Sequence, residues 1–495
     1  MTIATIIIYD EVNCKIQNLD VNTRRKLSNM FSYEIPGARF TPAVKLGRWN
    51  GKTSYFQLSG RTYINLLDEI IPVLIKEEYE IELDDKREYV GTFDFKKVDN
   101  NSLAHINWPK GHQLENQPII MRDHQVTAIN NYLSNPQSLQ GISTASGKTI
   151  ITTALSKAIE PYGRSIIIVP NRSLVNQTKE DYDNIGLDVG VFYGKEKDYT
   201  RKHTICTWQS LHSLYKKTKK GEAVIEIQDF LDDVVCVICD EVHTCKATAL
   251  KDLLSGPLSH IPLRWGLTGT IPKEEFEFKA LQTCIGPIVG KVTAIELQEK
   301  GILANCHIHI KQLQDNRVFS NYQSELKYLL SDSDRLEQLS SIISDIAKTG
   351  NTLVLIDRVS AGQTLTERLQ RNDSWMGLTD NIVFVSGATK TDKRQEEYDK
   401  VKENNNMVII ATYGVASTGI NIVELRNVVL LEPGKSFVKV IQSIGRGLRV
   451  SKTKNFVNIY DITSSCKYSK RHLTARKRFY REAEYNYKVE KIHRK

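Results

Sequence analysis

The segment STASGKT, residues 143–149, combines the residue types that a phosphate-binding loop requires. Backbone N–H groups approach an anion only where side chains are small, and a helix that begins at the loop directs its N-terminus at the phosphate. Lys148 would then neutralise the terminal phosphates, and the hydroxyl of Thr149 would bind Mg²⁺. The small residues before them are Ser143, Thr144, Ala145, Ser146 and Gly147. The segment therefore predicts an ATP site that uses Mg²⁺.

Ala145 is a departure from the usual loop, because many such loops have glycine at this place. Its methyl group intrudes little if the residue has a negative φ, whereas a positive φ brings strain of about 1 kcal/mol. The alternative interpretation of the segment is a turn of small residues ahead of a helix.

Two adjacent carboxylates follow the apolar run VVCVIC, residues 234–239. Open α/β sheets present their ligands at the carboxyl ends of strands, and this run has the composition of a buried strand. Asp240 could hold Mg²⁺ there, and Glu241 could polarise the attacking water as a general base. The carboxylates could also belong to the start of a helix. The upstream GKT sequence favours the ATP site.

The segment QSIGRGLR supplies two arginines near residue 450. Arg446 and Arg449 are three residues apart, so on a helix they share one face. Arginine is suited to bridging phosphate oxygens, and one supplied from a second domain acts as an arginine finger. The alternative is a solvated helix, although its two glycines would weaken it.

These residues need a scaffold, and two series of short apolar runs that alternate with helical segments predict it. Such alternation is typical of βαβ units and parallel sheets. We therefore predict an α/β fold with one domain at 116–292 and a second at 293–466. Residues 1–115 are expected to form a small α+β domain and a linker, with strands in TIATIIIYD, TSYFQL and YINLL, a helix near 63–79, and the linker in the polar stretch 95–118.

The net charge of +9 is concentrated in two segments. Residues 21–60 contain seven Lys and Arg against one Glu, and residues 467–495 contain eleven against three, with five aromatic residues among them. Either segment alone could be a solvated face, but together they favour a polyanion such as nucleic acid. The basic C-terminal tail, 467–495, permits an ordered helix, a disordered arm or a docking site for a partner.

The segment GRWNGKTSYF, residues 47–56, places basic and aromatic groups on a tight turn. Arg48, Trp49 and Lys52 would suit phosphate binding and base stacking. The alternative is a β-hairpin in which Trp49 packs into the core of the N-terminal domain.

Composition also indicates a cytoplasmic location. Eight cysteines in 495 residues are too few for a disulfide framework and fit a reducing compartment. No apolar run approaches the roughly 20 residues that cross a membrane. The N-terminus lacks the basic region and the cleavage site of a signal peptide.

The motifs as a set resemble a superfamily 2 helicase over roughly residues 120–460. In order they are R-x-x-Q, GKT, P-x-x-x-L, T-W-Q-S, DEVH, LTGT, S-G-A-T, A-T-x-G-x-x-S-T-G-I and Q-x-x-G-R-x-x-R. The resemblance implies two tandem RecA-like domains in a monomer that hydrolyses ATP to move on DNA. It also implies branched substrates, namely junctions, stalled forks, displaced-strand loops and RNA–DNA hybrid loops, and a place in recombination, repair and replication.

The resemblance implies a role for each matching residue. Gln125 would contact adenine, with Arg122 beside it in the nucleotide site, and Thr268 and Thr270 would couple hydrolysis to domain movement. The implied catalytic residues are Lys148, Glu241, Gln442, Arg446 and Arg449. The residues implied to follow the nucleic-acid backbone are Pro170, Asn171, Arg172, Thr207, Trp208, Gln209, Arg358, Gly387, Thr389 and Thr412.

Several alternatives stay open. His243 could couple the ATP site to the second domain or could be an ordinary packed histidine, and Trp208 could belong to the core. Asn421 stands where many relatives have Asp, so no ionic role is expected for it. The other candidate functions are a duplex translocase that does not separate strands, an RNA-specific motor, and a binding or annealing protein with a decayed ATP site.

Overall fold

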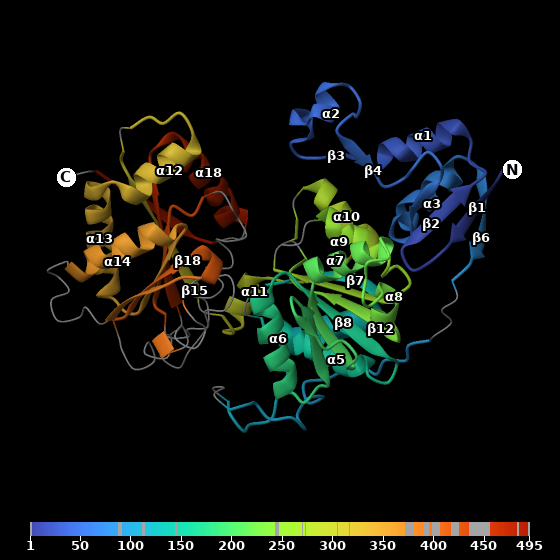
Figure 1. Ribbon diagram of the computed structural model, residues 1–495, viewed down its shortest axis with the longest axis horizontal. Helices are drawn as coiled ribbons and strands as arrows, with labels where there is room; N and C mark the ends of the chain where they lie inside the picture. The colour runs from blue at the N-terminus through green and yellow to red at the C-terminus, as the bar shows by residue number, and fades with distance from the viewer. Residues whose placement is uncertain are drawn as a thin grey trace. The chain divides into compact units, whose positions relative to one another are not determined.

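The computed structural model describes residues 2–87, 92–110, 114–143, 146–242, 247–269, 271–272, 274–303, 305–315, 317–371, 381–387, 389, 396–397, 406–416, 425–434, 456–482 and 485–493. The chain forms two compact units (Figure 1). The first contains Met1–Ile142 and Gly147–Val292, and the second contains Ser143–Ser146 and Thr293–Lys495. Within the described ranges, no helix is long and apolar enough to cross a membrane.

The N-terminal module, residues 2–87, contains a sheet in the order β5-β2-β1-β6 and a ribbon of β3 and β4. Alternate residues of the first strand, Ala4, Ile6 and Ile8, enter its core, as the two-residue period of a strand requires. The elements are β1 (Thr2–Ile8), β2 (Asn13–Gln17), α1 (Val21–Met30), β3 (Ser32–Glu34), η1 (Ala38–Phe40), α2 (Pro42–Lys45), β4 (Lys52–Ser54), β5 (Arg61–Tyr63), η2 (Ile64–Leu66), α3 (Leu67–Lys76) and β6 (Tyr79–Asp85).

The strand expected at YINLL is wrong, because Ile64–Leu66 forms a 3₁₀ turn that leads into α3. Leu66, Ile70 and Leu74 are all fully buried in the core of the module. Their spacing of four residues is the helical period, and it extends the helical pattern back to the start of the run.

The first α/β domain has an eight-stranded sheet in the order β10-β9-β11-β8-β12-β13-β7-β14. All neighbouring strands are parallel except β10, which is antiparallel to β9. The elements are α4 (Asp123–Ser134), β7 (Gln137–Ile142), α5 (Lys148–Ile159), β8 (Arg164–Val169), α6 (Arg172–Asn184), β9 (Val189–Tyr193), β10 (Glu196–Lys197), β11 (His203–Thr207), α7 (Trp208–Lys219), α8 (Ile227–Phe230), β12 (Val234–Cys239), α9 (Ala247–Leu254), β13 (Leu263–Thr268), α10 (Glu275–Ile285) and β14 (Ile288–Val292). The predicted parallel sheet is confirmed.

Apolar side chains pack on both faces of this sheet. Ile167 and Val169 of β8 enter one apolar cluster, and Ile166 and Ile168 enter the other. A strand buried on both faces needs apolar residues at nearly every position, which explains the run IIIV at residues 166–169.

The segment expected to be a linker packs against the first α/β domain. Leu103 is buried in the core of that domain, and Phe95 and Trp108 pack against it. The ring of Phe95 lies 5.2 Å from that of Tyr162, the residue that follows α5 by three positions. The segment therefore forms part of the hydrophobic core rather than a spacer.

The N-terminal module is docked on helices α9 and α10 of the first α/β domain (Figure 1). The Tyr55 hydroxyl donates to the carbonyl of Phe276 at 3.0 Å, and the Lys279 Nζ lies 2.6 Å from Glu69 Oε1. The Lys251 ammonium lies 4.5 Å from the centroid of the Tyr55 ring. Polar, ionic and cation–π contacts thus hold the module on the two helices that follow β12 and β13.

The second unit has a seven-stranded sheet in the order β17-β18-β16-β19-β20-β15-β21, with all neighbours parallel. This confirms the second predicted α/β domain. The elements are α11 (Ala294–Glu299), β15 (Asn305–Leu313), α12 (Tyr322–Ser331), α13 (Ser333–Ala347), β16 (Thr352–Ile356), α14 (Val359–Arg371), β17 (Ile382–Val385), β18 (Val408–Thr412), α16 (Tyr413–Ala416), β19 (Asn427–Leu431), β20 (Phe456–Ser464), α18 (Lys467–Glu482) and β21 (Tyr487–Ile492).

The described residues of the basic C-terminal tail form a helix and a strand, which agrees with the ordered helix among the three alternatives. β21 pairs in parallel with β15 and completes the sheet at one edge. A buried ion pair holds α18 against β20: Arg476 donates to both carboxylate oxygens of Asp461, at 2.8 and 2.9 Å. Burial alone would lower the pKa of Arg476, but the Asp461 carboxylate outweighs it and the pKa is raised.

Candidate active site and nucleic-acid interface

Five adjacent strands of the first sheet carry the predicted motif residues at one edge. The order β11-β8-β12-β13-β7 is parallel throughout, so the carboxyl ends of these strands lie side by side. The phosphate loop follows β7, the LTGT residues end β13, and the carboxylates follow β12. The PNR and TWQ residues follow β8 and β11. A parallel sheet thus gathers segments that are far apart in the sequence.

The phosphate loop leads directly into α5, as predicted, with Gly147 as its N-cap. Gly147 has a φ of 86°, in the left-handed region that glycine adopts without strain. A Cβ at this position would lie only 2.3 Å from Nε2 of Gln125. The Oε1 of Gln125 accepts the N–H of Arg122 at 2.9 Å, which fixes the amide against the loop. The R-x-x-Q and GKT motifs are therefore in direct contact.

The carboxylates meet the loop at Lys148. The Lys148 ammonium forms an ion pair with Glu241, whose other oxygen lies 3.4 Å from the backbone nitrogen of Gly269. Glu241 has a φ of 50°, which is uncommon for a residue with a side chain. Its own N–H donates to Asp240 Oδ1 at 2.9 Å. Strained backbone of this kind is concentrated at functional sites, where the surrounding structure holds it.

The electrostatics of the site reflect burial and close charges. Burial raises the pKa of Asp240 to about 6, although the Lys148 ammonium opposes the rise. Burial alone would lower the pKa of Lys148, but Glu241 and Asp240 outweigh it, so this pKa is raised. A cation bound beside Asp240 would lower the pKa of that carboxyl, because an opposite charge favours its ionised form.

The residues present fit a nucleotide and a divalent cation. The first turn of α5 leaves backbone N–H groups without helical partners, and its N-terminus favours an anion. Gly147 leaves the backbone bare at the place where a Cβ would fill the space. Asp240 and the hydroxyl of Thr149 offer the oxygen ligands that Mg²⁺ prefers.

Six predicted nucleic-acid residues of the first α/β domain lie after β8 and around the end of β11. Asn171 and Thr207 are helix N-caps, whose side chains accept the N–H groups of Leu174 and Ser210. The side chains of Asn171 and Thr207 therefore cap α6 and α7. At these positions, the groups left to contact a phosphate are the backbone N–H groups in the first turn of each helix. Gln209 donates to the carbonyl of Pro170 at 3.3 Å and so joins the two motifs.

The other two residues of these motifs point in different directions. Arg172 is exposed at the start of α6. Trp208 is half-buried and packs against the core cluster on one face of the sheet, which agrees with the core alternative for part of its surface.

In the second unit, the predicted residues lie at the ends of the adjacent strands β17, β18 and β16. Arg358 follows β16 and donates to Gln323 at 2.9 Å. Gly387 is exposed with open space beside it, and the Thr389 hydroxyl accepts the N–H of Ser386. Thr412 ends β18 and is buried.

In the N-terminal module, the predicted turn is braced by Trp49. Its indole N–H donates to the carbonyl of Lys52 at 2.8 Å. The side chain is half-buried, whereas Arg48 and Lys52 are exposed. Trp49 thus shapes the turn that presents the two cations.

Seven of the predicted site residues lie outside the described residues: Thr144, Ala145, His243, Thr270, Gln442, Arg446 and Arg449. Within the described residues, the structure adds Gly269, whose N–H faces Glu241. The sequence signal for it was the glycine of LTGT, because a bare backbone allows a close approach.

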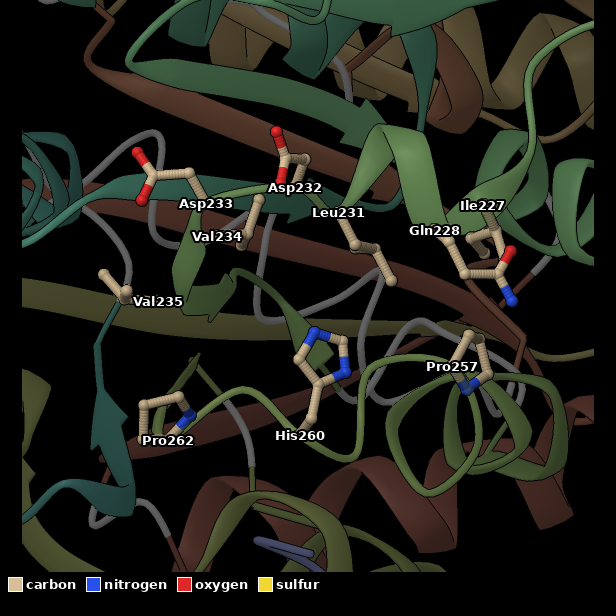
Figure 2. A pocket seen from close by; sticks show the side chains of 10 residues that line it. All are labelled: Ile227, Gln228, Leu231, Asp232, Asp233, Val234, Val235, Pro257, His260 and Pro262. Atoms are coloured by element: carbon tan, nitrogen blue, oxygen red, sulfur yellow. The ribbon is translucent and has the colours of Figure 1, made fainter. Parts of the chain in front are cut away.

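A cavity of about 590 Å³ opens at the opposite edge of the same sheet, where β12 and β13 begin (Figure 2). Asp232, Asp233 and His260 line it. None of the predicted motif residues lines this cavity.

Comparison with known families matches both α/β domains. Residues 118–273 match the family "Type III restriction enzyme, res subunit", and residues 334–451 match the "Helicase conserved C-terminal domain". The matched ranges cover both groups of motifs at the sheet edges.

Comparison with individual proteins extends the likeness over most of the chain. The chain is 24% identical over 479 residues to "ATP-dependent DNA helicase uvsW" of Enterobacteria phage T4, covering 92% of this chain and 90% of that protein. It is 22% identical over 389 residues to "DNA 3'-5' translocase XPB2" of Sulfurisphaera tokodaii, covering 71% and 83%. A fragment of a type I restriction enzyme HsdR subunit from Vibrio vulnificus has a similar fold, with a TM-score of 0.57, 17% identity and coverage of 97% and 85%.

Proposed function

Because the chain is an ATP-dependent helicase of superfamily 2, we propose that it moves along DNA and remodels or unwinds branched structures. Junctions, stalled forks, displaced-strand loops and RNA–DNA hybrid loops are the proposed substrates, in recombination, repair and replication. The names of two relatives, a DNA helicase and a DNA translocase, support DNA as the track. The basic turn at Arg48 and Lys52 supports a second contact with a branch.

One observation carries the proposal: five neighbouring strands end in the ATP motifs and in the nucleic-acid motifs at a single sheet edge. Hydrolysis at β7, β12 and β13 is thereby next to the segments after β8 and β11. A small displacement at Glu241 can reach α6 and α7 through the adjacent strand ends. This is the arrangement that a motor needs in order to convert ATP turnover into a changed grip.

The roles at the ATP site follow from the contacts. Lys148 leaves Glu241 to neutralise the terminal phosphates, and this frees the Glu241 carboxylate to orient the attacking water. Asp240 and Thr149 would hold Mg²⁺, which supplies charge neutralisation at the phosphate oxygens. Gln125 and Arg122 bind the adenine, and Gln442, Arg446 and Arg449 supply the arginine-finger chemistry.

The proposal is tested by ATP hydrolysis with the wild type and Lys148→Ala. The panel contains no nucleic acid, single strand, linear duplex, three- and four-way junctions and an RNA–DNA hybrid loop. We expect the highest stimulation with branched or hybrid DNA, and a fall on the order of a hundredfold or more in Lys148→Ala, since one stabilising donor contributes that much. Lys157→Ala, on the same helix but exposed, is the control.

A Lys148→Ala protein that hydrolyses ATP at the wild-type rate would contradict the site assignment. Equal stimulation by plain duplex, without strand separation, would favour the translocase alternative. Absence of hydrolysis on every substrate would favour the binding protein with a decayed site.

A further inference from the structure

We propose that the exposed face of α18 binds the sugar–phosphate backbone of duplex DNA. The inference rests on the proposed function, and it adds a contact outside the helicase motifs. It assigns a role to the basic segment at 467–495.

The exposed positions of α18 recur with helical spacing and form one basic stripe. The stripe consists of Lys467, Lys470, Arg471, Arg478 and Arg481. Thr474 and Ala475, which share this exposed face, carry no charge. At about 1.5 Å per residue the stripe is about 21 Å long, enough to follow several phosphates.

Among the described residues, the cations at the first turns of the stripe are not ion-paired, although Asp315 lines the groove beside these turns and Glu325 accepts the N–H groups of Tyr468 and Ser469. In the part of the chain that the structure describes, neither Lys467, Lys470 nor Arg471 forms an ion pair, although other lysines of the second unit do. Lys311, for example, lies 2.7 Å from Glu490. Protein surfaces normally intersperse both signs, so a stripe of one sign favours a polyanionic ligand.

A groove of about 630 Å³ lies beside these turns. Lys467, Lys470 and Arg471 line it from α18, and Arg317 lines it from the loop after β15. Asp315 also lines the groove; it is buried and pairs with Arg335, which Glu432 shares. The groove thus presents three cations of α18 without ion-pair partners among the described residues, and a fourth, Arg317, that lies 3.8 Å from Asp332.

The inner face of α18 holds this stripe rigidly. The Ser469 hydroxyl donates to Glu325 at 2.9 Å, and the Tyr480 hydroxyl donates to Asp461 at 3.0 Å. Arg476 adds its paired contacts to Asp461. A helix fixed before binding loses little conformational freedom on binding.

The aromatic residues of the segment favour duplex over single strand. Phe479 and Tyr480 are buried, and the half-buried Tyr468 donates its hydroxyl to the carbonyl of Ser320. Proteins that hold single strands combine cations with exposed aromatic rings on which bases stack. The half-buried Tyr468 ring beside the stripe already faces Lys467 and Arg471, which lie 5.7 and 6.0 Å from its centroid. The stripe is therefore suited to contact the phosphate backbone, which a duplex presents in a regular array.

The test compares two triple variants of the full chain, each of which removes three positive charges from the second unit. The stripe variant is Lys467→Gln/Lys470→Gln/Arg471→Gln, and the control is Lys327→Gln/Lys348→Gln/Arg371→Gln, which changes exposed residues on other parts of that unit. Affinity for a 20-base-pair duplex and for a single strand is measured across salt concentrations. Hydrolysis of ATP without nucleic acid reports on the integrity of the motor.

We expect the stripe variant to bind duplex more than tenfold more weakly than the control. Its slope of log affinity against log salt should fall by about 2 to 3, since each phosphate contact contributes about 0.9. Single-strand affinity should change less than twofold, and the conservative variant Lys467→Arg/Lys470→Arg/Arg471→Lys should bind duplex like the wild type.

A stripe variant with the same duplex slope as the control would overturn the inference. So would equal losses for duplex and single strand, or a wild type that hydrolyses ATP but binds no duplex. Failure of the proposed function has its own readout, which is absence of ATP hydrolysis with every nucleic acid.

Discussion

At the scale of single residues, the contact between Gln125 and Gly147 links adenine recognition to the phosphate loop. Gln125 is buried, its Oε1 is held by the Arg122 N–H, and its Nε2 faces the Cα of Gly147. Two motifs that lie on either side of β7 are thus adjusted to each other before nucleotide arrives.

Substitution of Gly147 by alanine tests this contact. The new Cβ would lie 2.3 Å from Nε2 of Gln125, and the alanine would also have to keep the φ of 86° that Gly147 has. We expect nucleotide affinity to fall at least tenfold, and the free energy of unfolding to fall by more than the roughly 1 kcal/mol of left-handed strain alone.

Gly186→Ala is the matched control, because Gly186 has a φ of 77° but open space around it. Isothermal titration with ATP and urea unfolding measure both quantities. Equal effects of the two substitutions would show that the Gln125 contact does not matter.

The roles of site residues could be predicted from the sequence where those residues act through local geometry. The spacing of the residues alone was enough to predict a role for the lysine and the hydroxyl after Gly147 and for the carboxylates after a β-strand. The cap roles of Asn171 and Thr207 were missed, because the same letters also fit a motif that contacts nucleic acid directly. Their side chains instead cap the helices that they begin.

At the scale of elements, α18 shows how buried charges fix one helix on a sheet. Arg476 and Asp461 are almost completely buried and pair in a two-pronged geometry. Removal of one member of such a pair leaves an uncompensated charge in the interior, which is strongly destabilising.

Arg476→Leu is therefore expected to destabilise the second unit by about 3–5 kcal/mol. The double variant Arg476→Leu/Asp461→Leu should lose less than the sum of the two single changes, because no unpaired charge remains. Thermal and urea unfolding of the four proteins in a double-mutant cycle measure the coupling.

Lys477→Leu, one position along the same helix, should change stability by about 0.5 kcal/mol or less, as is usual for surface sites. Additive effects at Arg476 and Asp461 would contradict the coupling.

Most strands of both sheets were predictable because parallel strands buried on both faces are continuous apolar runs, although the short or polar strands β7, β10 and β14 were missed. β21 was not predictable either, since YKVEKI places charges between apolar residues and lies at an edge. Its partner β15 is far away in the sequence. A pairing of that kind leaves no local signal, so the segment had the composition of a tail.

At the scale of the whole molecule, the docking of the N-terminal module places a basic surface on the helices that follow the ATP motifs. α9 comes after Asp240 and Glu241, and α10 comes after Thr268. Movement of these helices during hydrolysis would be transmitted to the module through Tyr55 and Glu69.

The double variant Tyr55→Phe/Glu69→Gln removes two of these contacts. We expect ATP hydrolysis without DNA to stay within twofold of the wild type, and its stimulation by branched DNA to fall about tenfold, which is a coupling energy of about 1.4 kcal/mol. Steady-state hydrolysis with a three-way junction measures the ratio.

The matched control is Glu77→Gln, which removes the exposed ion pair with Lys26 inside the module. If both proteins keep full stimulation, the docking contacts do not transmit movement.

The pairing of β15 between β20 and β21 has a consequence for biosynthesis. Ile308 pairs with Ile459 on one side and with Tyr487 on the other. β15, the first strand of the second sheet in the sequence, therefore cannot form its pairings until β20 and β21 have been synthesised. Until those residues leave the ribosome, β15 exposes two unpaired edges, and such edges are prone to pair with other chains. The second domain therefore folds only after nearly all of its chain has been made, while the first domain can already be complete.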